Sequence, residues 1–225
     1  MRRTLEGVTA NEDVLERAGL DRGVLVKAVE ELYDILDTLD DAMRKKSMMP
    51  FSTNVELTTY SAMIGNILGA SLESLSNGRF LKNDPHKFPD LISLDQAYKN
   101  IEIKIALEKN TPKGHLIKPG CYLTCRYVLC DQDGRFPIGN ATRGTKAYIW
   151  EMRCGVLQNK HFGESNTAGD SGKTAWVNKL GMKELKVVFF DRRRAPFADN
   201  SRTFKKYDRI ISGADGKATI ESARF

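Results

Sequence analysis

The chain has 225 residues, of which 41% are hydrophobic and 28% are charged, and its formal net charge is +6. This composition is typical of a folded globular protein and argues against extensive disorder, and the length fits one compact domain. No apolar run reaches the roughly 20 residues that cross a bilayer, and the start lacks the apolar centre of a secretion signal. We therefore expect a cytoplasmic protein, bacterial or archaeal, with no membrane partner, whose positive charge favours polyanions.

Two amphipathic helices are predicted in the first third of the chain. Apolar residues recur at spacings of three and four from Leu25 onward, which predicts a helix over 21–46. Thr53 followed by Glu56 is typical of a capping box, so a second helix is expected from there to about residue 77.

Strands follow the second helix. Alternating or continuous apolar residues predict strands over 88–93, 100–107, 121–130, 146–157 and 186–191, with loops over 109–120, 131–145 and 158–172 and a short helix over 174–180. This order predicts a mixed α/β (α+β) fold, a central mixed sheet flanked by helices. We expect a single domain with a helical part (1–50), a core (51–130) and a C-terminal part with strands and long polar loops (131–225).

The strand over 100–107 holds an acid and an amine side by side. Successive strand residues point to opposite faces, so Glu102 and Lys104 share one face, while the isoleucines of this strand face the core. Asp90 stands upstream with eleven residues intervening. If the two extended segments are neighbours, the carboxylates of Asp90 and Glu102 lie close together.

Two converging carboxylates form an oxygen-ligand site that suits Mg²⁺, which proteins often hold with only one or two carboxylates. Such an ion polarises a phosphoryl oxygen and acidifies a bound water. Lys104 beside it would orient that water or lower its pKa. The pattern predicts Mg²⁺ as cofactor and phosphodiester hydrolysis as chemistry.

Pro89-Asp90 followed by Glu102-Ile103-Lys104 resembles the signature of the PD-(D/E)xK nuclease superfamily. That superfamily includes most type II restriction endonucleases, mismatch-repair nicking enzymes and Holliday-junction resolvases. The resemblance implies a restriction-endonuclease-like core and Mg²⁺-dependent, sequence-specific cleavage of double-stranded DNA that leaves 5′-phosphates. It implies that Asp90 and Glu102 bind the metal, that the carbonyl of Ile103 adds a ligand, and that Lys104 is the catalytic lysine.

Families of this kind often carry a further acid on the helix before the signature. Glu73 matches that placement best and is a candidate catalytic residue and metal ligand. Glu56 is the second candidate, although its capping-box position supplies a structural explanation. We expect a homodimer, because a DNA duplex offers two equivalent strands about a two-fold axis.

Basic and polar residues in the loops are candidates for DNA contact. The candidates are Lys82, Asn83, Lys113, Arg143, Gln158, Asn159, Lys160, His161, Lys173 and Arg193. The segment 158–161 is the first choice for reading bases in the major groove.

Three alternatives remain open. One is a structure-selective repair nuclease or resolvase of the same superfamily, and another is a DNA-binding protein without catalysis. The third is a nucleotide-dependent enzyme that uses segment 169–174. We expect no nucleotide cofactor, because Thr167 stands where a phosphate loop requires glycine.

Overall fold

The chain folds around a central mixed β-sheet with helices on both faces. The structure, a computed structural model, describes residues 2–139, 142–165, 174–198 and 200–211. Among these residues, none of the helices combines the length and apolar character that crossing a membrane requires.

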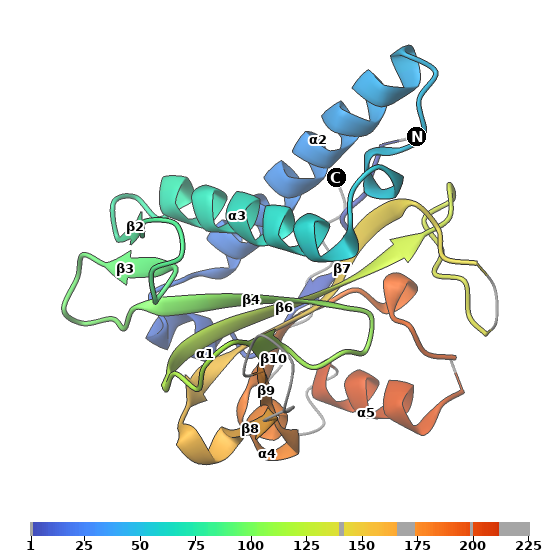
Figure 1. Cartoon of the computed structure of the whole chain (residues 1–225). Coiled ribbons are helices and arrows are strands. Elements are labelled where there is room, and N and C mark those ends of the chain that lie inside the picture. Colours follow the sequence, from blue (N-terminus) through green and yellow to red (C-terminus); the bar gives the residue numbers. More distant parts are fainter. Residues whose placement is uncertain (1, 140–141, 166–173, 199, 212–225) are drawn as a thin grey trace.

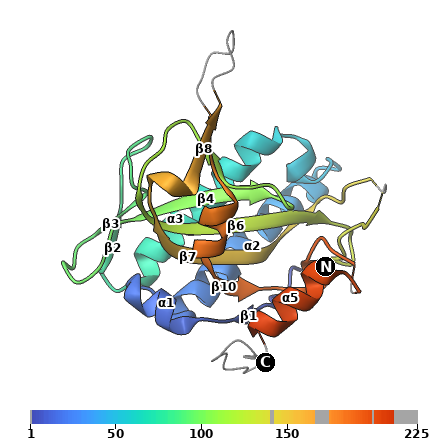
Figure 2. The ribbon, with the colours of Figure 1, turned by 90° about the horizontal axis from the view of Figure 1, so that it is seen from below.

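The central sheet has seven strands within the described residues. In spatial order they are β1 (Val8–Thr9), β10 (Lys186–Phe190), β7 (Lys146–Leu157), β6 (Gly120–Cys130), β4 (Ile101–Leu107), β3 (Leu91–Ser93) and β2 (Phe80–Lys82). Only β4 and β6 pair in parallel, so the sheet is mixed as predicted. Figure 2 shows β4, β6, β7 and β10 following one another across the molecule. A smaller sheet contains β5 (Lys113–Gly114), β9 (Thr174–Val177) and β8 (Phe162–Ser165).

Helices cover both faces of the central sheet. They are α1 (Glu12–Arg17), α2 (Arg22–Lys45), α3 (Leu57–Leu75), α4 (Lys179–Glu184) and α5 (Arg202–Ile211), with short 3-10 turns η1 (Phe51–Thr53), η2 (Asn159–His161) and η3 (Arg192–Arg194). Figure 1 shows α2 and α3 above the sheet and the small sheet, α4 and α5 below it. The predicted mixed α/β fold with a helix-flanked sheet is confirmed.

Helix α2 confirms the first predicted helix almost to the residue. The side chain of Asp21 caps it by accepting a hydrogen bond from the Val24 amide at 2.8 Å. The expected apolar stripe, from Leu25 through Leu32, is fully buried. Local periodicity and a capping acid were therefore sufficient to place this helix.

Helix α3 is also present, but the predicted capping box is wrong. Thr53 belongs to η1, and its hydroxyl donates to the Pro50 carbonyl at 2.7 Å. Glu56 occupies the N-cap position of α3, yet its side chain makes no capping hydrogen bond there. The chain thus makes a separate 3-10 turn before α3 begins.

The segment 174–180 was expected to be helical, but only its last two residues are. Residues 174–177 form β9, which pairs with β5 and β8. Helix α4 begins only at Lys179, because the Asn178 side chain accepts from the amides of Leu180 and Gly181. The prediction also missed β1, β2, β5, β8, α1 and α5.

Helix α3 packs closely on β4, and this contact positions the site. Gly65 faces Ile105 so closely that an added Cβ would lie 3.1 Å from its Cγ1 atom, and Gly69 similarly faces Ile103. The isoleucines of β4 point toward α3 and the main core, as the alternation predicted. Glu102 and Lys104 consequently lie on the other face.

Candidate functional site

Asp90 lies beside the strand that carries Glu102. Strands β3 and β4 pair antiparallel with Leu91 opposite Ile101, so the two segments are neighbours as expected. The Oδ2 atom of Asp90 accepts a hydrogen bond from the Ile103 amide at 2.7 Å. The carboxylate therefore takes the place of the backbone carbonyl acceptor that a longer β3 would provide.

Glu102 is a buried carboxylate that is only partly satisfied. Its side chain forms an ion pair with Lys104 through Oε1, and its Oε2 is buried without a hydrogen-bond partner among the described residues. Burial raises the pKa of Glu102, against the opposing charge of Lys104; the nearby Asp90 raises this pKa further, and Lys118 lowers it. Asp90 and Glu102 thus interact electrostatically.

A groove of about 1020 Å³ runs along the open edge of β4. Because β3 pairs with β4 only at Ile101, the edge beyond that residue has no strand neighbour in the described chain. Helix α3 forms one wall and residues 110–115 form the other. The charged or imidazole-bearing residues that line it are Lys82, His86, Asp90, Lys104, Lys113 and His115. Cationic groups therefore outnumber carboxylates in this groove.

The residues present fit a magnesium ion. A buried carboxylate oxygen without a partner is costly unless a cation or a donor satisfies it, and Glu102 Oε2 is such an atom. No three His, Cys, Asp or Glu side chains within the described ranges form a group that could share a metal. The pair Asp90 and Glu102 suffices in principle, because Mg²⁺ keeps several waters.

No protein-family model matches this chain. A search of curated proteins also finds no match. The assignment of function consequently depends on the arrangement of the residues themselves.

The two further acids predicted for this site are absent from the groove lining. Glu73 accepts a hydrogen bond from the Lys82 amide at 3.1 Å, and Lys82 is the register partner of Leu91. Glu56 is exposed at the start of α3. The involvement of either acid in a metal site stays a prediction, and the described residues contain no group of three metal-ligating side chains.

Among the residues predicted to bind DNA, Lys82 and Lys113 line the groove. Lys82 donates from Nζ to the Asn66 carbonyl at 3.3 Å, so its ammonium lies against α3. Lys113 belongs to β5, is exposed, and borders the groove from the side of the small sheet. Both are available to an anion in the groove.

Three other candidates have partners within the protein. Asn83 donates to the Pro89 carbonyl at 2.9 Å and thereby braces the turn before Asp90. Arg143 is bound to Glu108 at 2.6 Å, and Arg193 is bound to Glu6 at 2.8 Å. None of these three lines the groove.

The segment predicted to read bases forms the 3-10 turn η2. His161 is buried, and its Nδ1 accepts from the Gln158 amide at 3.1 Å, so it stabilises the turn and offers no surface to DNA. Gln158, Asn159 and Lys160 are exposed. Lys173 and segment 166–173 lie outside the described residues.

Sequence reasoning missed Tyr122, which lies beside the carboxylates. Tyr122 on β6 is the parallel register partner of Glu102, and its hydroxyl donates to the Lys118 carbonyl at 2.6 Å. Burial and the charges of Glu102 and Asp90 raise the pKa of Tyr122, which places this ring beside both acids. No local pattern signals this neighbourhood, because a parallel register depends on a long-range pairing.

Proposed function

We propose that the chain is a Mg²⁺-dependent type II restriction endonuclease with a restriction-endonuclease-like core. The observation that carries this proposal is the position of Asp90 directly before β3, where its carboxylate accepts from the Ile103 amide beside Glu102, and Glu102 keeps a buried oxygen without a partner among the described residues. Lys104 stands beside Glu102, as the resembling nuclease signature requires. The charged side chains that line the groove bordering these residues are three lysines and Asp90.

In this proposal Asp90 and Glu102 hold the metal and Lys104 supplies the adjacent positive charge. A bound Mg²⁺ supplies polarisation of a phosphoryl oxygen and acidification of a coordinated water. The Ile103 amide fixes the Asp90 carboxylate against β4, so this ligand is oriented before any ion arrives. Lys104 offers its ammonium to the phosphodiester group or to the attacking water.

The groove lining supports double-stranded DNA as substrate. Duplexes are held chiefly through their phosphates by lysines and arginines, whereas single strands are held by stacking on aromatic rings. The described residues of the lining include three lysines, Lys82, Lys104 and Lys113, and no phenylalanine, tyrosine or tryptophan. We propose further that the chain acts as a homodimer, because a duplex presents two equivalent strands.

The direct test is incubation of long linear duplex DNA with the protein in Mg²⁺ or in EDTA. The proposal expects discrete fragments in Mg²⁺ and none in EDTA or with Asp90→Asn. Asp95→Asn is the matched control, because Asp95 lies in the β3–β4 connection and caps the Ala97 amide, which an asparagine also does. This control should cleave like the unaltered chain.

Other outcomes separate the alternatives. Cleavage confined to branched or mismatched DNA would favour a repair nuclease or resolvase. DNA binding without any cleavage in Mg²⁺ would indicate a non-catalytic DNA-binding protein and contradict the proposal.

A further inference from the structure

Residues 115–119, here called the strap, connect β5 to β6 beside the carboxylate pair. The strap is fixed at both ends, because Gly114 pairs with Ala175 in the small sheet and Gly120 pairs with Leu157 in the central sheet. Gly114 also lies close to Lys104, whose Cε atom would be 3.7 Å from an added Cβ. The strap therefore runs past the face of β4 that carries Lys104.

Lys118 on the strap makes two contacts, one with a neighbour of Glu102 and one with a neighbour of Asp90. Its carbonyl accepts from the Tyr122 hydroxyl at 2.6 Å, and Tyr122 is the register partner of Glu102. Its ammonium lies 4.8 Å from the ring centroid of Phe88, which stands two residues before Asp90. Lys118 thus contacts neighbours of each carboxylate.

The ammonium of Lys118 is partly buried and forms no ion pair with a carboxylate in the described part of the chain, although its charge lowers the pKa of Glu102. A cation resting on an aromatic face remains free to accept an anion on its other side. Lys118 therefore adds a second positive charge near Glu102, in addition to that of Lys104.

We propose that Lys118 is a second phosphate-binding lysine of the site, which binds the phosphodiester group of DNA next to Asp90 and Glu102. This inference rests on the proposed nuclease function. In it the Tyr122 hydroxyl holds the backbone of the strap through the Lys118 carbonyl, and the Phe88 ring positions the Lys118 ammonium. The nuclease signature does not include Lys118. The inference therefore adds one residue to the site that the signature defines.

The test compares Lys118→Gln with Lys118→Arg and with a matched control, Lys109→Gln. Lys109 also rests on a phenylalanine ring, 5.1 Å from the centroid of Phe197, but it follows the opposite end of β4. Two quantities are measured: the cleavage rate in Mg²⁺ at saturating duplex DNA, and the affinity for a fluorescent duplex in EDTA over a series of salt concentrations.

The proposal expects Lys118→Gln to lower the cleavage rate on the order of 100-fold, as loss of one preorganised donor to a phosphoryl group does. It should also reduce the slope of log affinity against log salt by about one, because one phosphate contact is lost. Lys118→Arg should restore the slope, and Lys109→Gln should change neither quantity. A common unfolding midpoint for the variants separates these effects from misfolding.

If Lys118→Gln keeps both the rate and the salt slope, while Asp90→Asn abolishes cleavage, this inference is overturned and the proposed nuclease function stands. If the unaltered chain cleaves no DNA, the proposed function is overturned instead. The salt slope in EDTA then decides alone whether Lys118 binds phosphate.

Discussion

The Asp90 carboxylate accepts a hydrogen bond from the Ile103 amide at 2.7 Å, so this acid is bonded to the backbone of the strand that carries Glu102. A single side chain therefore has two roles. It replaces a missing strand neighbour at the edge of β4, and it presents a carboxylate to the groove. The two roles can be separated by substitution.

Asp90→Asn should abolish cleavage and leave the fold intact. The asparagine oxygen still accepts from the Ile103 amide. The negative charge that would attract a metal ion and repel a phosphate is removed. Asp90→Ala removes the acceptor too and should cost about 1 kcal/mol of unfolding free energy more than Asp90→Asn. Urea unfolding of both variants checks this difference, and equal stabilities would contradict the structural role.

Local patterns predicted the elements that carry the motif but not what surrounds them. The alternation within β4 correctly separated Glu102 and Lys104 from the isoleucines, because strand periodicity is a local property. The positions of Tyr122 and Lys118 follow from the parallel pairing of β4 with β6, which no local signal encodes. Long-range pairing therefore limited what could be foreseen of the site.

The remaining errors have similar causes. Residues 174–177 form a strand because β5 and β8 flank them, and the helix predicted over 174–180 begins only after the Asn178 cap, as α4. His161 was chosen as a surface residue in a polar loop, yet the turn η2 buries it. Tertiary contacts decided both cases, and composition did not reveal them.

A second buried acid, Glu151 on β7, is expected to be a major determinant of stability. It is 1% exposed and binds Arg126 at 2.9 Å and Arg153 at 2.6 Å. Glu151→Gln would leave the buried Arg126 and the partly buried Arg153 without a counter-charge and should cost about 3–5 kcal/mol. Chemical denaturation measures this loss.

The matched control for Glu151 is Asp208→Asn. Asp208 pairs with Arg192 at 3.3 Å at an exposed position, where an ion pair contributes about 0–1 kcal/mol. If both variants lose a similar amount of unfolding free energy, the buried network contributes no more to stability than an exposed ion pair.

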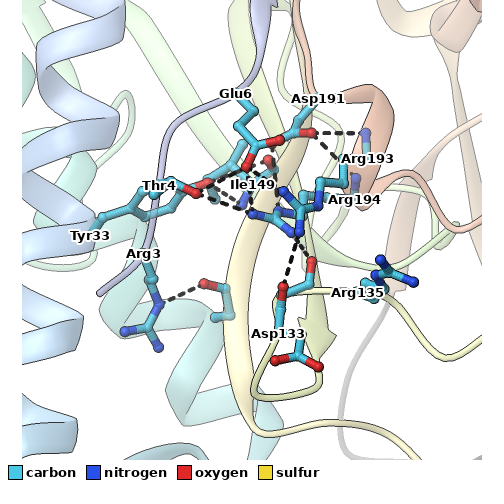
Figure 3. A network of polar contacts seen from close by, with 12 residues as sticks. Arg3, Thr4, Glu6, Tyr33, Asp133, Arg135, Ile149, Asp191, Arg193 and Arg194 are labelled. Carbon is cyan, nitrogen blue, oxygen red and sulfur yellow. Dashed lines mark hydrogen bonds and ion pairs between the residues drawn. The ribbon is translucent and has the colours of Figure 1, made fainter. Parts of the chain in front are cut away.

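Asp191 is expected to make stability fall as the pH rises. It is fully buried between β10 and η3, where it lies in a network with Glu6, Arg193 and Arg194 (Figure 3). Burial, only partly offset by Arg194, raises the pKa of Asp191 to about 6 from an ordinary value of 3.8. Since the folded chain binds this proton more tightly than the unfolded chain, the contribution of Asp191 is fully present below pH 4 and is lost as the pH rises through 6.

Because the pKa of Asp191 rises from 3.8 to about 6, the unfolding free energy should change by at most about 3 kcal/mol between pH 4 and pH 7. Asp191→Asn keeps an oxygen for the amides of Arg193 and Arg194 but cannot ionise. The unfolding free energy of the unaltered chain, measured relative to this variant, should therefore decline across that range. A difference that is constant with pH, or that grows, would contradict the raised pKa.

Substitutions of Lys113 and Arg193 test whether DNA binds in the groove or to the basic surface in general. Lys113 lines the groove and is exposed, whereas Arg193 is bound to Glu6 away from the lining. Lys113→Gln should reduce the salt slope of duplex binding by about one, because a lysine that contacts a phosphate releases a counterion when DNA binds. Arg193→Gln should leave that slope unchanged, since the arginine is already neutralised. Both slopes can be measured by fluorescence anisotropy in EDTA, and equal effects of the two substitutions would place the DNA elsewhere than in the groove along β4.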